Sequence, residues 1–266
     1  KAGSLFLWDA QLAKLNTLPD INQPLPNVLS AYDHASDKGF NFVKGSSAST
    51  DAYAKRELTA KGALHFMVSQ SFAETISGLA FFGIEANSAL RAELFNKIMG
   101  GSPNIYFSIW QRVTRIGQNR GGYYGPMIAY GPNTNNFAFY MQSKQNNLAV
   151  GSGSIRESKL GASAVHSSAL APNLVKANVK SFSGTGVTAS TPLQIGSGVM
   201  LPWNASQTQN ESPSFAVYRI YIEDLSLSGR TYEQVKAIDD AEFAKAFDVG
   251  GRFYGDTWSN PATVLP

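Results

Sequence analysis

The sequence predicts a mainly β protein, an antiparallel β-sandwich or jelly roll with one or two short helices. Stretches in which apolar and polar residues alternate recur along the chain, as strands with one buried face require. Turns rich in glycine, asparagine and serine separate these stretches, and helical periodicity is confined to two short segments. No linker or internal repeat divides the chain, so residues 1–266 are expected to form a single domain.

Alternation is clearest at residues 62–72, 104–116 and 214–224, which are expected to be strands. Alternate side chains of a strand point to opposite faces of the sheet. In the first strand, Leu64, Phe66 and Val68 are expected opposite His65, Met67 and Ser69; in the second, Ile105, Phe107 and Ile109 opposite Tyr106, Ser108, Trp110 and Arg112. In the third, Tyr218, Ile220 and Ile222 are expected opposite Val217, Arg219, Tyr221 and Glu223.

The middle of the chain is less regular. Three short segments between residues 127 and 153, separated by turns, are expected to form a β-meander. Residues 151–190 are rich in serine, alanine and glycine, so strands are expected there but their positions are not defined. A short strand pair is expected from Leu193 to Leu201.

Two helices are expected. Leu90, Leu94 and Ile98 recur on one helical face within residues 88–99, with Ser88 as the expected N-cap and Gly100-Gly101 as the stop. The spacing of Thr231 and Gln234 is that of a capping box and predicts the start of a second helix.

The two ends of the chain are expected to pack differently. An apolar run at residues 5–8 is followed by Pro19, Pro24 and Pro26, and proline disfavours a central strand. Residues 1–30 are therefore expected to be an extended segment on the surface or on a partner chain. Near the other end, residues 250–258 contain Phe253, Tyr254 and Trp258 after a glycine pair, and are expected to fold back as a structural clasp.

Composition limits the possible functions. Cysteine is absent, which excludes disulfides and thiol chemistry. The net charge is +3, and the basic residues are scattered along the sequence, so nucleic acid is not an expected partner. No stretch of about 18 apolar residues predicts a membrane span.

The segment SFAVYRIYIEDLSLSGRTYEQVKAIDDAEFAKAFDVGGRFYGDTW, residues 214–258, resembles the closing segment of laminin-G-like, concanavalin A-like jelly rolls. Such modules are found in phage tail, tail-fibre and other virion-surface proteins. The resemblance implies a non-catalytic adhesion module, located on the virion surface or outside the cell, that binds bacterial surface polysaccharide. Other virion proteins and further copies of the chain are possible partners.

Aromatic residues among glycines and asparagines suggest where a glycan would bind, because a flat ring can stack on a sugar and amides can bond its hydroxyls. Two loops have this composition, at residues 119–136 and 202–213. The expected glycan-binding residues are Arg120, Tyr123, Tyr124, Tyr130, Trp203 and Asn204. Alternatively, Tyr123 and Tyr124 begin a strand, with one of them buried.

Two other functions stay open. One is a structural role in capsid decoration or tail assembly, which the extended N-terminal segment would suit. The other is a polysaccharide lyase of jelly-roll type, in which His65, Arg112, Tyr140 and Gln142 would be catalytic. The expected lyase sequence signatures are absent, and His65 is better explained as a hydrogen-bonded residue on a half-exposed sheet face.

Glycoside hydrolysis and metal chemistry have little support. Glu223 and Asp224 are adjacent, so they face opposite sides of a strand, and Asp239-Asp240 is expected at a helix start, where carboxylates favour the helix dipole. No pair of ligands has zinc-binding spacing, and no cofactor is expected. Calcium stays open through loop residues Asp33, Asp37 or Asp256, although most loop aspartates simply form turns.

Overall fold

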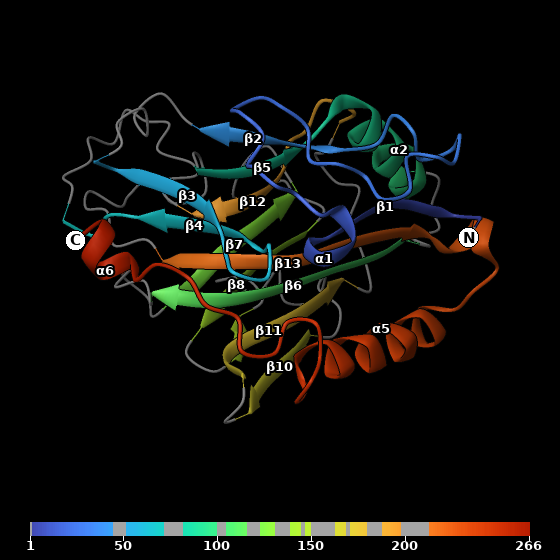
Figure 1. Ribbon diagram of the computed structural model, residues 1–266. Coiled ribbons are helices and arrows are strands. Elements are labelled where there is room, and N and C mark those ends of the chain that lie inside the picture. Colours follow the sequence, from blue (N-terminus) through green and yellow to red (C-terminus); the bar gives the residue numbers. More distant parts are fainter. Residues whose placement is uncertain are drawn as a thin grey trace.

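The computed structural model of the protein is mainly β with a few helices (Figure 1). It describes residues 2–44, 52–71, 82–99, 105–115, 188–197 and 213–266, together with the backbone of strands at 123–130, 139–144, 147–149, 163–168 and 171–179. The described strands form two sheets, and every described strand pair is antiparallel.

The first sheet has seven strands in the order β10-β11-β6-β13-β4-β3, with β1 also paired to β13. Their bounds are β1 Ser4–Asp9, β3 Ala54–Leu58, β4 Leu64–Val68, β6 Ile105–Arg115, β10 Ser163–Ser168, β11 Ala171–Val179 and β13 Ser214–Asp224. Along one edge, β13 pairs with β6 over its whole length. Along its other edge, β13 pairs with β4 in its first half and with β1 in its second half. The first and last described strands of the chain, β1 and β13, are therefore neighbours.

The second sheet has six strands in the order β2-β5-β12-β7-β8-β9. Their bounds are β2 Phe40–Lys44, β5 Phe82–Ala86, β7 Tyr123–Tyr130, β8 Phe139–Lys144, β9 Asn147–Ala149 and β12 Leu193–Ser197. Consecutive strands β7, β8 and β9 are antiparallel neighbours, so the expected meander is confirmed.

One hydrophobic cluster joins the two sheets. The rings of Phe42 in β2 and Phe66 in β4 lie 6.0 Å apart, and those of Phe6 in β1 and Phe40 in β2 lie 5.0 Å apart. Burying a side chain of this size contributes roughly 1.5–3 kcal/mol, so the apolar faces of the alternating strands account for the packing of the sheets. The face of the seven-stranded sheet turned away from the six-stranded sheet is called the outer face below, and the same cluster continues there under α5 and the residues that follow it.

The expected faces of β13 are partly wrong because the strand contains a bulge. Its register with β6 shifts between Val217 and Arg219, leaving Tyr218 as an extra residue. A bulge of this kind places two successive side chains on the same face. Val217 therefore lies on the core face with Ile220, and Tyr218 lies on the outer face with Arg219.

The N-terminal segment also differs from the expectation of a surface segment for residues 1–30. Residues Ser4–Asp9 form β1, and Trp8 is fully buried. The proline-rich stretch that follows is held by Asn27, whose side-chain amide donates to the carbonyls of Leu5, Ala35 and Lys38 at 3.2, 2.9 and 3.1 Å. The apolar run is thus part of the sheet, while the prolines lie outside it.

The described helices are α1 Ala10–Ala13, α2 Ser88–Met99, α4 Leu225–Ser228, α5 Tyr232–Phe247 and α6 Pro261–Val264. The capping box of Thr231 and Gln234 at the start of α5 is confirmed. The N-cap of α2 is Asn87 rather than Ser88, because the Asn87 side chain accepts from the Leu90 N–H at 2.9 Å. Asp239 lies within α5 and not at a helix start.

Helix α5 and residues 248–266, called the C-terminal tail below, cover part of the outer face (Figure 1). The ring of Phe247 lies 4.9 Å from Tyr218, and that of Phe253 lies 5.0 Å from the same tyrosine. The expected clasp is therefore confirmed for Phe253, which is buried against the sheet. Tyr254 takes no part in it, because this side chain is 37% exposed. Among the described helices, none has the length and apolar character needed to cross a membrane.

Candidate functional site

Arg112, on the outer face, has no hydrogen-bond or ion-pair partner among the described residues. Two neighbouring arginines on the same face do: Arg252 donates to Asp9 at 3.0 Å, and Arg219 lies 3.8 Å from Asp239. Arg112 is 8% exposed, and its Nε is buried without a partner. Its terminal nitrogens keep contact with solvent, so an incoming acceptor could reach them.

Aromatic rings surround the Arg112 guanidinium. Its central carbon lies 5.2 Å from the ring centre of Trp258, 5.8 Å from Phe247 and 5.9 Å from Tyr218. A cation within about 6 Å of an aromatic face is stabilised by the ring quadrupole. Trp258 is itself partly exposed, so the cation and one aromatic surface meet at the protein surface.

Two buried polar atoms lie behind this surface. The Tyr218 hydroxyl faces the Asp256 carboxylate, which acts on it through its charge and as a hydrogen-bond acceptor. In the described part of the chain, neither this hydroxyl nor Asp256 Oδ2 has any other partner. Asp256 is held through its other oxygen, which accepts from the backbone N–H groups of Lys61 and Thr257 at 2.7 and 3.0 Å. Burial, and then the Asp256 charge, raise the pKa of Tyr218, which stays a neutral phenol. We refer to Arg112, Tyr218, Asp256 and Trp258 as the outer-face site.

His65 and Arg112 belong to one transverse row of the sheet. In this row Glu57, His65, Ala216 and Arg112 are successive cross-strand partners on β3, β4, β13 and β6. The His65 Nδ1 lies 2.8 Å from Glu57 Oε1, and its Nε2 lies 2.8 Å from the Thr114 hydroxyl on β6. Because the residue between them on β13 is alanine, the imidazole extends across that strand.

The C-terminal tail completes this network. Glu57 also accepts from the Ser259 N–H at 2.8 Å and from its hydroxyl at 2.7 Å. Burial lowers the pKa of His65, although Glu57 acts in the opposite direction. Burial would raise the pKa of Glu57, but the bonds from His65 and Ser259 hold it below its usual value. At neutral pH the network therefore joins a neutral imidazole to a carboxylate.

The sequence of hydroxyl, imidazole and carboxylate has the connectivity of a hydrolytic triad. Here, however, the His65 side chain is fully buried, and both of its ring nitrogens are in hydrogen bonds. Taking up a proton from a substrate would require breaking one of these bonds. The arrangement is suited to bracing β3, β4, β6 and the tail against one another.

A second charged network lies at the far end of β13. Arg230 forms an ion pair with the buried Glu223, which also accepts a hydrogen bond from the Tyr221 hydroxyl. Burial, and then the bond to Glu223, raise the pKa of Tyr221 to about 12. Asp224, on the opposite side of the strand, pairs with Lys97 of α2 at 2.7 Å. These carboxylates hold the helices after β13 and are not available as a catalytic pair.

The residues expected to bind glycan are only partly described. Arg120, Trp203 and Asn204 lie outside the described residues. Tyr123, Tyr124 and Tyr130 belong to strand β7, for which the backbone alone is described. The expectation that the first two begin a strand is thus confirmed, whereas their burial and their part in binding are untested.

The four residues of the lyase alternative are divided between the two sheets. His65 and Arg112 share a row of the seven-stranded sheet. Tyr140 and Gln142 lie on β8 of the six-stranded sheet, where they pair with Ala129 and Met127 of β7. The topology therefore brings together two pairs and not a set of four.

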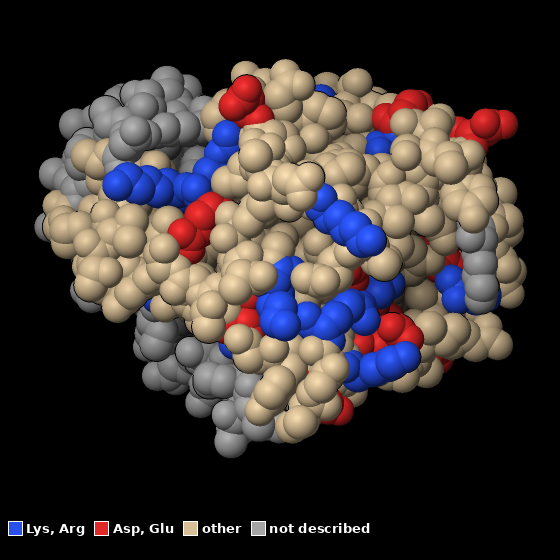
Figure 2. Space-filling model, viewed as in Figure 1, with Lys and Arg blue, Asp and Glu red and all other residues tan. Residues whose placement is uncertain are grey.

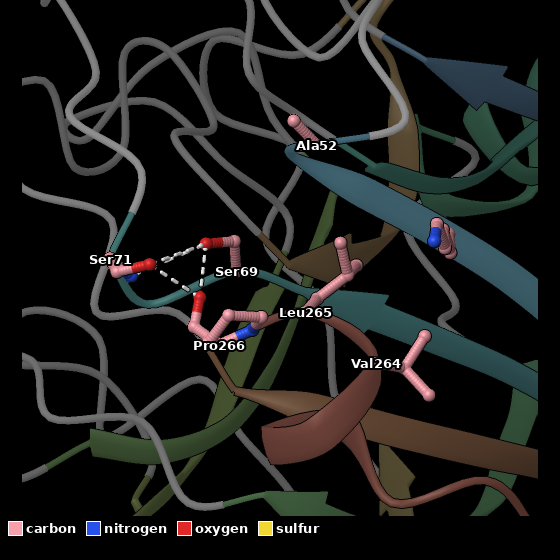
Figure 3. Close-up of a pocket in the computed structure, with 7 residues that line it drawn as sticks. Ala52, Ser69, Ser71, Val264, Leu265 and Pro266 are labelled. Atoms are coloured by element: carbon pink, nitrogen blue, oxygen red, sulfur yellow. Dashed lines mark hydrogen bonds between the residues drawn. The ribbon is translucent and has the colours of Figure 1, made fainter.

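A cavity of about 550 Å³ lies where the tail meets β3 and β4 (Figure 3). Its lining residues are Ala52, Lys55, Ser69, Ser71, Val264, Leu265 and Pro266. The hydroxyls of Ser69 and Ser71 both point at the Pro266 carbonyl oxygen and donate to it at 2.6 Å. Since both hydroxyls are engaged in holding the tail, this cavity offers fewer free polar groups than the outer-face site.

The aspartates considered as calcium ligands lie apart from one another, and each has a local structural explanation. Asp37 pairs with Lys38 at 2.7 Å on the surface, and Asp256 accepts backbone N–H groups. Asp33 is exposed in a turn. Within the described ranges, no three histidine or carboxylate side chains gather closely enough to hold a metal ion.

Basic side chains are visible as a band across the face seen in Figure 1, with acidic side chains among them (Figure 2). The band lies in the region where α5 and the tail cross the sheet. Arg219, Arg252 and Arg112 are all on this side of the molecule, around Trp110 and Phe247. An anionic ligand approaching this face would meet a favourable charge.

Comparison of the chain with protein-family models, with curated proteins and with solved structures finds no match. The sequence predicted Arg112 as a catalytic residue of the lyase alternative and Trp258 as part of a structural clasp. It also predicted Tyr218 on the opposite face of β13. No local pattern marks the bulge that moves Tyr218, so the sequence held no signal for the complete set.

Proposed function

We propose that the protein is a non-catalytic glycan-binding module with a concanavalin A-like jelly-roll fold, acting on a virion surface or outside the cell. Two packed antiparallel sheets, with the first and last described strands side by side, are compatible with this fold. The resemblance of residues 214–258 to virion-surface modules supports the location. Bacterial surface polysaccharide is the proposed ligand.

The observation that carries the proposal is the contact between Trp258 and Arg112. A partly exposed indole offers an apolar face to a sugar ring, and an unpaired guanidinium beside it offers several N–H donors. Sugar recognition uses this combination because a pyranose has one apolar face and polar edges. The proposed site is thus on the outer face, in addition to the loops at 119–136 and 202–213.

A binding role is favoured over catalysis. Two histidines lie in the row of Arg112, each two strands away: His65 on β4 and His166 on β10, of which the backbone alone is described. His65 is fully buried with both nitrogens bonded. Tyr140 and Gln142 lie in the other sheet, away from this row. A lyase needs an acid and a base near the same sugar, and these placements favour binding without bond cleavage.

The experiment is binding of the whole chain to an array of bacterial surface polysaccharides, with and without calcium. Trp258→Ala is expected to reduce retention of the bound glycan at least tenfold. Tyr254→Ala is the matched control, because it removes an exposed ring from the same tail. Loss of binding in both variants, or in neither, would place the glycan elsewhere. Silence of the wild-type protein across the array would favour the structural virion role instead.

A further inference from the structure

We propose that the outer-face site recognises the carboxylate of an acidic sugar, with Arg112 as its ligand. This inference rests on the proposed function and adds to it the chemical class of the sugar.

The guanidinium is in an unusual state for a largely buried arginine. A buried arginine normally has a carboxylate or carbonyl partner, and even the half-buried Arg252 and Arg115 have one here. Arg112 has none among the described residues, although its Nε is buried. A carboxylate matches the planar donors of a guanidinium in a bidentate contact. Such a ligand would supply the partner that the fold leaves out.

The local charge favours a single negative charge on the ligand. Asp256 lies beyond Tyr218 in the same site and its charge acts on Tyr218, as does that of Arg112. Asp256 repels every negative charge on a ligand and Arg112 supplies one positive charge, so a single carboxylate matches the site better than a multiply charged group. The band of basic side chains in Figure 2 adds a longer-range attraction for an acidic polymer.

The remaining groups suit the rest of a sugar. Trp258 can stack on the apolar face of the ring, 5.2 Å from the guanidinium carbon. Asp256 Oδ2 and the Tyr218 hydroxyl are buried and act on each other, and they have no further partner among the described residues, so together they can hold a water that bridges to a sugar hydroxyl. A uronic acid residue carries all the complementary groups: one carboxylate, several hydroxyls and an apolar ring face.

The first experiment uses monosaccharides as probes. D-Glucuronate, D-glucose and acetate are titrated separately into the whole protein, and the indole N–H signal of Trp258 is followed by NMR after assignment with Trp258→Phe. Glucuronate is expected to shift this signal, with an affinity at least tenfold above that for glucose or acetate. An equal response to glucose, or no response to glucuronate at tens of millimolar, would overturn the assignment of a carboxylate.

The second experiment uses variants and a polymer. Arg112→Gln is expected to weaken binding of a polyuronate at least tenfold, and Arg112→Lys to weaken it less. Lys245→Gln, which removes one exposed charge from α5, is the matched control and should change affinity less than twofold. Thermal unfolding of each variant shows whether it is folded, and the Lys variant keeps the test valid if Gln destabilises the sheet.

Comparison of two polymers distinguishes recognition of the carboxylate from glycan binding in general. A polyuronate and its carboxyl-reduced derivative differ in the acid group alone. Tenfold weaker binding of the reduced polymer supports the inference. Equal binding of both polymers, unchanged by Arg112→Gln, overturns it while glycan binding stands. Failure to bind any polysaccharide, neutral or acidic, overturns both.

Discussion

The carboxylate of Asp239, in α5, accepts a hydrogen bond of 2.7 Å from the hydroxyl of Tyr106, in β6. A second bond comes from Ser108, two residues along the same strand, at 2.6 Å. Burial, and then the Asp239 charge, raise the pKa of Tyr106, so the phenol stays a donor. Helix α5 is thus attached to the sheet by a buried carboxylate as well as by its aromatic residues.

Tyr106→Phe should test this attachment. The variant keeps the ring contacts with Tyr221 and Tyr232 but leaves one hydrogen bond to a buried carboxylate unmade. We expect a loss of about 1–3 kcal/mol in the free energy of unfolding, measured by urea denaturation. Tyr254→Phe, at an exposed position, should be neutral. Equal stability of the two variants would show that the Asp239 contact contributes little.

Gly251, at the turn after α5, should not tolerate a side chain. A Cβ there would lie 2.5 Å from the Ala246 carbonyl oxygen and closer still to that of Lys245. Because both neighbours are helix backbone, Gly251→Ala is expected to cost about 3 kcal/mol. Gly255→Ala is the control, since its Cβ meets nothing within 4 Å and its φ of +67° predicts a cost of about 1–2 kcal/mol. A reversed order in thermal unfolding would contradict this packing.

His65 should make the protein less stable in mild acid. Its pKa is lowered in the folded state, so the unfolded chain binds the proton more readily. Stability should therefore fall as the pH drops below about 6.5, the ordinary value for histidine. His65→Gln cannot take up this proton and can keep bonds to Glu57 and Thr114. Urea midpoints at pH 7.5, 6.5 and 5.5 should show a shallower dependence in this variant, and parallel curves would refute the assignment.

The capping box of α5 predicts a coupled pair of substitutions. Thr231→Ala removes the acceptor for the Gln234 N–H, a bond of 3.2 Å, and should cost about 1 kcal/mol. Gln234→Ala removes the reciprocal acceptor for the Thr231 N–H, at 2.9 Å. Because the two bonds belong to one motif, the double variant should cost less than the sum of the singles. Strict additivity in a double-mutant cycle would show that the bonds act independently.

Local sequence patterns predicted local structure well. The alternation in β4 and β6 and the capping box of α5 are present as expected. These features depend on residues within a few positions of one another, where steric and hydrogen-bonding preferences act directly. Strands β2 and β3 were missed, since they lie in a small, polar stretch whose pairing is set by other strands.

The candidate site depended on contacts between distant parts of the chain. Glu57 bonds to Ser259 across 202 positions, and Arg112 meets Trp258 through the same tail. The sequence named His65 and Arg112 from their strand faces, yet it could not show that both ring nitrogens of His65 are bonded while Arg112 has no partner in the described part of the chain. That difference arises from which carboxylates the topology brings near.

By itself the sequence determined a mainly β chain, the apolar faces of its regular strands and the start of α5, because periodicity and capping are local properties. The tertiary structure decided which strands are neighbours, where β13 bulges, and that Tyr218 turns to the outer face beside Arg219. It also left Arg112, next to Trp258, without a hydrogen-bond partner among the described residues. Burial and pairing of a polar group depend on every element packed against it, so they follow from the fold and not from the neighbouring residues in sequence.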